Sequence, residues 1–295
     1  MCEKTLPISV VIPTWKRTTV LLVALKYILN CSPRPAEILV HIDAGDQKTE
    51  QCLRQVFSQS PVHWFQSNTT QGPGGGRNLL IRKASFPLIA CFDDDSWPLD
   101  SNYFQIAADL FAAHPEAAVL SAQEVRPGMN SVPTDSKIGE IACFQNCACL
   151  IRREAFLNTR GYLPLRYAYG MEEADVALQL LDSGWNILNT ASLRVYHDTD
   201  LKHHGSVPIN AAHIANTALL AYLRYPAQAW PLGVLQVLNR VKYAASIGRW
   251  RGIQQGLLQI PDIMWKYRNE RQTVGIETLR LSRKLSSSKS QIETV

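Results

Sequence analysis

The stretch Cys91-Phe92-Asp93-Asp94-Asp95-Ser96-Trp97-Pro98 joins an apolar run to three consecutive carboxylates. The run 86–92 predicts a buried strand, because it is short and is closed by polar residues and a proline. The carboxylates then lie at the carboxyl end of this strand, the edge where open α/β sheets bind ligands. We interpret them as oxygen ligands for Mg²⁺ or Mn²⁺, which such sites share with a substrate diphosphate. A solvated acidic turn, with one Asp capping the next helix, is the alternative.

The residues before this stretch alternate between strand and helix patterns. Strands are predicted over 8–12, 37–42 and 62–65, and helices over 18–29 and 49–57. Strands that alternate with helices are typical of βαβ units. The sequence therefore predicts an α/β fold with a mainly parallel sheet flanked by helices.

A glycine-rich stretch, Gln71-Gly72-Pro73-Gly74-Gly75-Gly76-Arg77-Asn78, lies between the third and fourth strands. It predicts a loop that leads into a helix over 79–84. Backbone N–H groups in such a loop, with the planar fork of Arg77, suit phosphate oxygens. It is not a P-loop, because no Lys-Ser/Thr follows, and it does not follow the first strand as a Rossmann fingerprint would. A flexible turn is the alternative.

A second acidic cluster, Glu172-Glu173-Ala174-Asp175, begins a predicted helix. The helix dipole favours acids in the first turn, so a capping role alone accounts for Glu172 and Glu173. Farther on, His197 ends a predicted strand. A histidine there is more often structural, but it is a good metal ligand if it converges on Asp95.

Composition separates the two parts of the chain. The 295 residues are 46% hydrophobic, enough for a sizeable core. The seven cysteines form no zinc pattern, and no signal peptide is visible, so we expect reduced cysteines and a cytoplasmic protein. From Leu201 onward, 13 Lys and Arg face four Asp and Glu. That part contains helical patterns over 210–225, 232–247 and 253–267, and its end, 286–295, is Ser-rich and predicts disorder.

Taken in order, these motifs resemble the family 2 glycosyltransferases, which have the GT-A fold. The resemblance runs in register over residues 7–206. It implies a GT-A (Rossmann-like) domain over 1–206, leaving a helical extension over 207–285 and a disordered tail over 286–295. The motifs that carry it are Val11-Ile12-Pro13-Thr14, Ile42-Asp43, Gly76-Arg77-Asn78, Phe92-Asp93-Asp94-Asp95, Arg152-Arg153-Glu154-Ala155-Phe156, Glu172-Glu173-Ala174-Asp175, Gly184-Trp185 and Val195-Tyr196-His197.

The resemblance also implies a role for each matched residue. Glu173 matches the catalytic base, with Glu172 as the fallback and Asp175 beside them. Trp185 matches an aromatic residue near the acceptor, although core packing is its commoner role. The implied metal ligands for Mn²⁺ or Mg²⁺ are Asp93, Asp95 and His197. The implied nucleotide-binding residues are Pro13, Thr14, Arg17, Asp43, Arg77, Asp93 and Asp94. The sequence departs from the family at Glu173, where Asp is usual, at Ala44, where a second acid is common, and at Lys16, which replaces Asn.

The implied activity is metal-dependent, inverting transfer of a sugar from a nucleoside diphosphate sugar to a saccharide or glycolipid acceptor, in cell-envelope polysaccharide or glycolipid synthesis. A non-catalytic nucleotide-sugar-binding protein is the alternative. No nucleic-acid motif is present, so we expect no nucleic acid partner. For the basic tail, two interpretations stay open: packing on the core, or a peripheral contact with anionic lipid at the inner face of the membrane.

Overall fold

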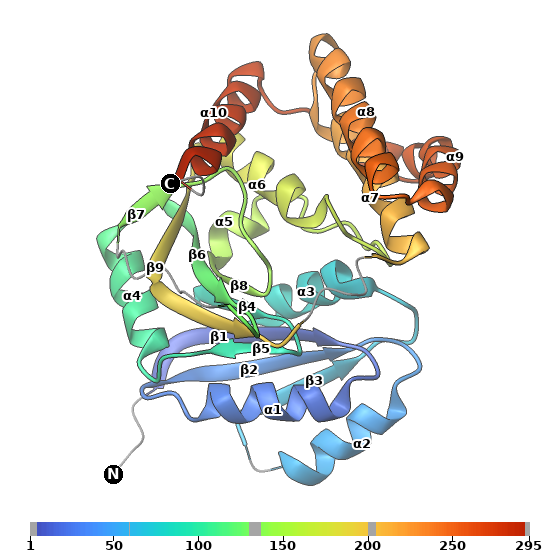
Figure 1. Ribbon diagram of the computed structural model, residues 1–295. Coiled ribbons are helices and arrows are strands. Elements are labelled where there is room, and N and C mark those ends of the chain that lie inside the picture. The colour runs from blue at the N-terminus through green and yellow to red at the C-terminus, as the bar shows by residue number, and fades with distance from the viewer. Residues whose placement is uncertain (1–4, 59, 130–136, 200–204, 293–295) are drawn as a thin grey trace.

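A computed structural model describes residues 5–58, 60–129, 137–199 and 205–292 (Figure 1). Its nine-stranded sheet has the order β3-β2-β1-β4-β8-β6-β9-β5, and β7 pairs with β9. The strands are β1 (Thr5–Thr14), β2 (Arg34–Ile42), β3 (Val62–Gln66), β4 (Leu88–Phe92), β5 (Ser96–Pro98), β6 (Ala117–Val125), β7 (Ile138–Glu140), β8 (Ala148–Arg152) and β9 (Asn186–His197). The helices are α1 (Thr18–Leu29), α2 (Gln47–Val56), α3 (Gly72–Lys83), α4 (Tyr103–Ala113), α5 (Arg153–Leu157), α6 (Glu172–Asp182), α7 (Val207–Arg224), α8 (Trp230–Ser246), α9 (Trp250–Lys266) and α10 (Ile276–Ile292), with short 3₁₀ turns η2 (Ala227–Ala229) and η3 (Arg268–Glu270).

The first half of the sheet is parallel, as the sequence predicts. Strand β1 pairs in parallel with β2 and β4, and β2 pairs in parallel with β3. The predicted α/β class, with a mostly parallel sheet between helices and a helical C-terminal region, is therefore confirmed.

The second half is mixed, and this decides what meets the end of β4. Strand β8 lies between β4 and β6 and runs antiparallel to both, with Ala148 opposite Phe92. Strand β9 runs parallel to β6, and its last residue pairs with the first residue of β5. The segment before β8 and the end of β9 are thus both brought to the carboxylates that follow β4.

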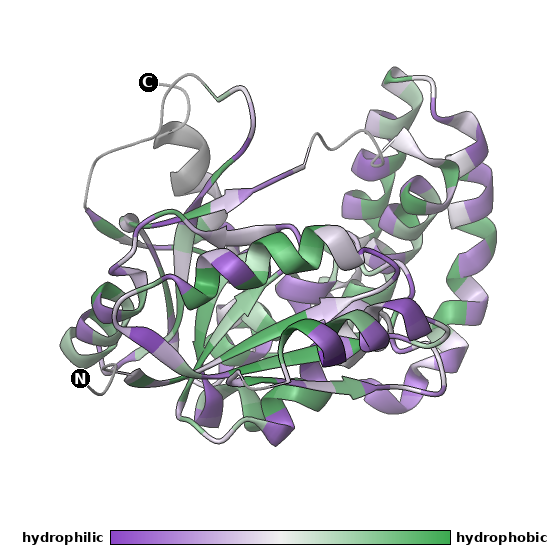
Figure 2. Cartoon of the chain, turned by 90° about the horizontal axis from the view of Figure 1, so that it is seen from below, coloured by the Kyte–Doolittle hydropathy of each residue, from purple (hydrophilic) through white to green (hydrophobic). Residues whose placement is uncertain are grey.

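Each face of the sheet has its own core. Along β1, Val10 and Ile12 belong to the cluster that α1, α2 and α4 cover, and Val11 belongs to the cluster under α3, α5 and α6. Successive side chains of a strand point to opposite faces, so a strand buried on both sides is apolar throughout. The strands accordingly form a largely hydrophobic centre in Figure 2.

The glycine-rich stretch is helical, which corrects the predicted loop over 71–78. Helix α3 begins at Gly72, which has a φ of +68°, and continues through the other glycines. A Cβ at Gly74 would lie 2.8 Å from Glu172 Oε1, and one at Gly76 would overlap the His41 imidazole. The glycines therefore let the first turns of α3 approach β2 and α6 closely.

The three predicted helices after residue 207 are present as α7, α8 and α9. Helix α10 extends to Ile292, within the segment 286–295 for which the sequence predicts disorder, and the disordered tail stays a prediction. Residues 293–295 lie outside the described part. Among the described helices, none is both long enough and apolar enough to cross a bilayer.

Candidate active site

Two of the three carboxylates after β4, Asp94 and Asp95, are held by side chains from the end of β1 and the start of α1. Asp94 accepts hydrogen bonds from the Thr14 hydroxyl and from Arg17 Nη1, both at 2.7 Å. The other terminal nitrogen of Arg17 donates to Asp95 at 2.7 Å. Burial raises the pKa of Asp94 to about 7 although Arg17 opposes that shift, whereas hydrogen bonds from His197 and Arg17 outweigh burial and lower the pKa of Asp95. Arg17 thus supplies the countercharge that makes adjacent buried carboxylates tolerable.

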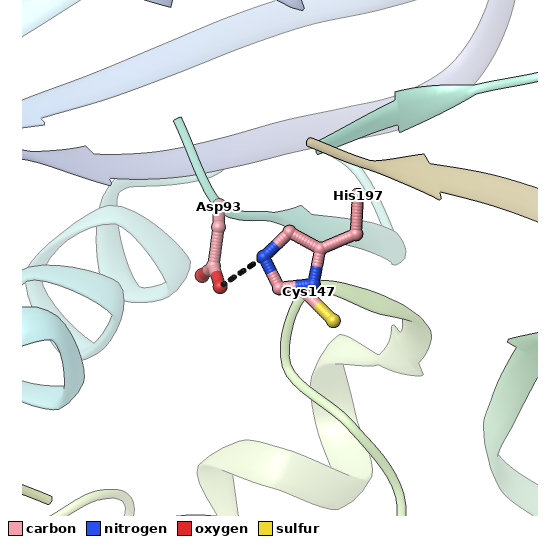
Figure 3. Close-up of side chains that lie close together, drawn as sticks. All are labelled: Asp93, Cys147 and His197. Carbon is pink, nitrogen blue, oxygen red and sulfur yellow. Dashed lines mark ion pairs between the residues drawn. The ribbon is translucent and has the colours of Figure 1, made fainter. Parts of the chain in front are cut away.

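His197, the last residue of β9, closes the other side of this group. Its Nε2 lies 3.9 Å from Asp93 Oδ2, as Figure 3 shows. The same nitrogen lies 3.2 Å from Asp95 Oδ1. Its Nδ1 lies 2.6 Å from Glu124 Oε1 on β6. Burial acts to lower the pKa of His197, but hydrogen bonds with Asp95, Cys147 and Glu124 raise it.

These residues fit a divalent cation. One ligand atom each from Asp93, Cys147 and His197 can be chosen so that all three lie within 4.8 Å of one another. Carboxylate, imidazole and thiolate are all metal ligands, and a set that includes nitrogen and sulfur suits Mn²⁺ better than Mg²⁺. Glu124 holds Nδ1 of His197 and so directs Nε2 toward the carboxylates, as acids that hydrogen-bond a ligating imidazole do at metal centres.

Arg77 connects the carboxylates to the start of α6. Its side chain is fully buried, forms an ion pair with Asp93, and lies 3.5 Å from Glu172 Oε1. Burial acts to lower the pKa of Arg77, but the charges of Asp93 and Glu172 outweigh this effect and raise that pKa. The guanidinium of Arg77 is thus enclosed by the two acidic groups, and its predicted role in nucleotide binding stays a prediction.

The two glutamates at the start of α6 differ in their surroundings. Glu172 is buried, and burial raises its pKa to about 8 against the opposing charge of Arg77. Glu173 is less enclosed and accepts a hydrogen bond from the Asn146 backbone N–H at 3.4 Å. Burial raises the pKa of Glu173 as well. Since Asn146 adjoins Cys147, this bond brings Glu173 to the same edge of the sheet as the carboxylates.

Three of the residues predicted to bind the nucleotide lie at the ends of β1 and β2. Pro13 and Thr14 end β1, and Asp43 follows β2. Asp43 accepts hydrogen bonds from the backbone N–H groups of Gln71 and Gly72 at 2.9 and 3.0 Å, so it caps α3. Beside Arg17, an open pocket of about 700 Å³ is lined by Arg17, the residues on either side of it, and the segment 45–48.

Two predicted residues lie away from this group. Asp175 forms a buried ion pair with Arg224 of α7. Trp185 precedes β9, whereas His197 ends that twelve-residue strand, so Trp185 lies at the opposite end of it. There Trp185 packs against the core, with Arg152 over its ring at 5.9 Å.

The sequence did not point to Glu124 or Cys147. The expectation of reduced cysteines gives Cys147 no role in the site, and no motif contains Glu124. Their contacts depend on the antiparallel pairing of β8 with β4 and on the parallel pairing of β9 with β6. A prediction that β8 pairs antiparallel with β4 would have placed Cys147 beside Asp93.

A sequence model described as glycosyl transferase family 2 matches residues 9–160. No curated protein matched the sequence.

Similar solved structures share the fold at low sequence identity. GalNAc-T7, solved with UDP, GalNAc and Mn²⁺, has a TM-score of 0.59 and 15% identity over 75% of this chain and 48% of its own. PcManGT, a mannosyltransferase from Pyrobaculum calidifontis solved with GDP-Man and Mn²⁺, has a TM-score of 0.59 and 12% identity over 98% and 81%. Residues 1–349 of S. aureus TarS, solved with UDP-GlcNAc, give 0.56 and 13% over 90% and 92%. The chain thus spans about half the length of the GalNAc-T7 chain, and these likenesses establish the fold alone.

Proposed function

The chain belongs to glycosyl transferase family 2, and on this premise we propose that it transfers a sugar from a nucleoside diphosphate sugar to an acceptor hydroxyl with inversion at the anomeric carbon. One observation carries the proposal: Arg77 joins Asp93 to Glu172, so the acids after β4 and the acids that begin α6 meet at one edge of the sheet. The first group can hold a diphosphate with its cation, and the second can take a proton from the acceptor.

On the donor side, we propose that Pro13, Thr14, Arg17 and Asp43 line the nucleotide pocket. Arg17 lines the open pocket at the starts of α1 and α2, and Pro13, Thr14 and Asp43 lie at the ends of the neighbouring strands β1 and β2. Because Arg17 pairs with Asp94 and Asp95, we expect it to exchange at least one carboxylate for a phosphate oxygen when the donor binds. UDP- and GDP-sugars, which TarS and PcManGT bind, are the first donors to test.

Asp93, Asp95 and His197 are the proposed ligands of a divalent cation, with Cys147 as a further ligand. When bound, the cation would neutralise charge on the leaving diphosphate. Arg77 holds Asp93 in place through an ion pair, and Glu124 holds His197 through a hydrogen bond.

Glu173 is the proposed general base. Its raised pKa brings it closer to the operating pH, where proton removal is most effective. A single base is sufficient for one direct displacement, which inverts the anomeric centre. Glu172 contacts Arg77 and is buried, so we propose that it positions the helix start, and that Asp175 is structural.

The test measures nucleoside diphosphate release and donor binding in the same variants. Chelation by EDTA should abolish release, and Mn²⁺ should restore it. Glu173→Gln should keep donor binding and lose about 10²–10⁴-fold in kcat. Glu154→Gln, at an exposed position of α5, is the matched control and should match the wild type. NMR of the product should show an anomeric configuration opposite to that of the donor.

Other results would contradict parts of the proposal. If Glu173→Gln kept near-normal turnover and Glu172→Gln were inactive, Glu172 would be the general base and Glu173 the residue that positions the helix start. Donor binding with no turnover for any acceptor would favour the non-catalytic binding protein. Full activity in metal-free buffer would exclude the proposed cation.

A further inference from the structure

Helices α8 and α9 expose an unusual amount of apolar side chain. On α9, the exposed fractions of Leu258, Trp265 and Trp250 are 75%, 70% and 66%. On α8, Val234 and Leu238 are similarly exposed and lie one helical turn apart. A folded core does not account for these residues, because scattered single exposures are normal whereas repeated ones along neighbouring helices indicate an interaction surface.

The opposite sides of both helices already have their partner. A Cβ at Gly233 of α8 would lie 2.5 Å from Ala221 Cβ on α7, and one at Gly256 of α9 would lie 2.9 Å from Ile214 Cβ on the same helix. Small residues therefore pack both helices tightly on α7. The exposed stripes point away from that contact and do not help to hold the helices in place. In Figure 1 these helices lie at the far end of the molecule from α1 and α2.

The charge around the stripes is predominantly positive. Helix α8 contains no acidic residue, and Asp262 is the sole acid of α9. Lys242, Arg251, Lys266 and Arg268 are exposed, and the Arg268 guanidinium lies 4.1 Å from the centroid of the Trp265 ring. Arg249, in contrast, donates to Asn210 at 2.7 Å and so belongs to the packing on α7. Hydrophobic and hydrophilic residues accordingly alternate along these helices in Figure 2.

We propose that this surface, the α8–α9 face, binds an anionic lipid bilayer. Tryptophan is favoured at the boundary between headgroups and acyl chains, leucine and valine extend below it, and Lys and Arg meet anionic headgroups. Because neither helix can cross a bilayer, the association is peripheral and lies in the plane of the interface.

Two other occupants fit less well. In a two-fold dimer the same surface meets itself, so the basic residues of one copy would face those of the other with a single acid on each α9 to compensate. A single-stranded nucleic acid would stack on the aromatic residues but would leave Val234, Leu238 and Leu258 without apolar partners. Anionic lipid complements both the charge and the aliphatic stripes.

The test uses the full chain and co-sedimentation with vesicles across a salt series. Vesicles of phosphatidylcholine with phosphatidylglycerol should bind the protein at low salt and release it as salt rises, and phosphatidylcholine alone should bind at least about tenfold more weakly. Tryptophan emission should shift to shorter wavelength on binding, because Trp230, Trp250 and Trp265 are exposed in the free protein.

Paired variants separate the two parts of the surface. Lys242→Glu with Arg251→Glu should weaken binding at least about tenfold, since each basic residue near an anionic surface contributes about a fivefold gain. Leu258→Gln with Trp265→Gln should weaken it at any salt concentration. Because all four side chains are exposed, thermal stability should be unchanged. Lys26→Glu with Arg82→Glu, exposed basic residues on α1 and α3, is the matched control and should bind as the wild type does.

Several results would overturn the proposal: no binding to anionic vesicles at low salt, equal binding to neutral vesicles, or equal losses in the α8–α9 and control variants. Dissociation of a dimer by Leu258→Gln with Trp265→Gln, without lipid binding by the wild type, would assign the surface to a second copy. Donor binding should be normal in all these variants, so failure here leaves the proposed transfer reaction untouched.

Discussion

At the residue scale, the site depends on two arginines that the acids surround. Arg17, at the start of α1, pairs with Asp94 and Asp95, and Arg77, in α3 on the other face of the sheet, pairs with Asp93. Without them, three successive carboxylates, two of them buried, would repel one another with no countercharge beside them. The sequence predicted the carboxylates and Arg77 from the short motifs that contain them, and the family resemblance added Arg17 as a nucleotide-binding residue. The resemblance places Arg77 near the nucleotide, whereas the structure buries its side chain between Asp93 and Glu172.

Glu124 and Cys147 mark the limit of prediction at this scale. Each becomes part of the candidate site through strand pairing between segments far apart in the sequence, which no local motif records. Glu124 lies 73 residues from its partner His197. We could match His197 to a family pattern, but its orienting acid could be found only in the structure.

The role of Glu124 can be tested through metal affinity. Glu124→Gln should weaken Mn²⁺ binding about 10–100-fold, because residues that hold a ligating imidazole have effects of this size. Electron paramagnetic resonance of free Mn²⁺ measures this without relying on activity. Glu116→Gln, at an exposed position just before β6, is the control and should bind Mn²⁺ as the wild type does. Unchanged affinity in Glu124→Gln would remove His197 from the proposed ligand set.

At the element scale, α3 is helical where residue propensity predicts a loop. Repeated glycine disfavours a helix, so the stretch before Arg77 predicted a loop. Packing decided otherwise: Pro73 suits a first helical turn, Asp43 caps the helix, and the absent Cβ atoms let α3 lie against His41 and Glu172. Helix α3 carries Arg77 to its ion pair with Asp93. The glycines therefore support the site by letting this helix pack closely.

Gly76→Ala tests this explanation, because propensity and packing predict opposite results. Propensity alone would stabilise α3 by about 1 kcal/mol. The new Cβ would overlap the His41 ring, which is buried and hydrogen-bonded to Ser67 at 2.7 Å. We expect a net loss of about 1–3 kcal/mol in the free energy of unfolding, measured in urea. Gly139→Ala, which meets no atom within 4 Å, should be close to neutral. A stabilised Gly76→Ala variant would show that α3 can shift freely.

At the scale of the whole molecule, we propose that the parts on either side of the predicted boundary at residues 206 and 207 depend on each other for stability. Asp175 is one turn after Glu172 and Glu173 on α6, and its ion pair with Arg224 joins that helix to α7. Arg224 also donates to the carbonyls of Glu270 and Gln272, at 2.8 and 3.2 Å. We infer that the extension supports the helix that carries the proposed base.

Arg224→Met should therefore destabilise the whole chain. It leaves the buried Asp175 without its countercharge, which typically costs about 3–5 kcal/mol in the free energy of unfolding. Asp175→Leu in the same chain should recover part of this loss, because no uncompensated charge then remains. Arg280→Met removes an ion pair with Glu277 that is exposed on α10, and such pairs contribute about 1 kcal/mol or less. Equal urea midpoints for Arg224→Met and Arg280→Met would mean that α6 keeps its place without the extension, and that 1–206 is a separable domain after all.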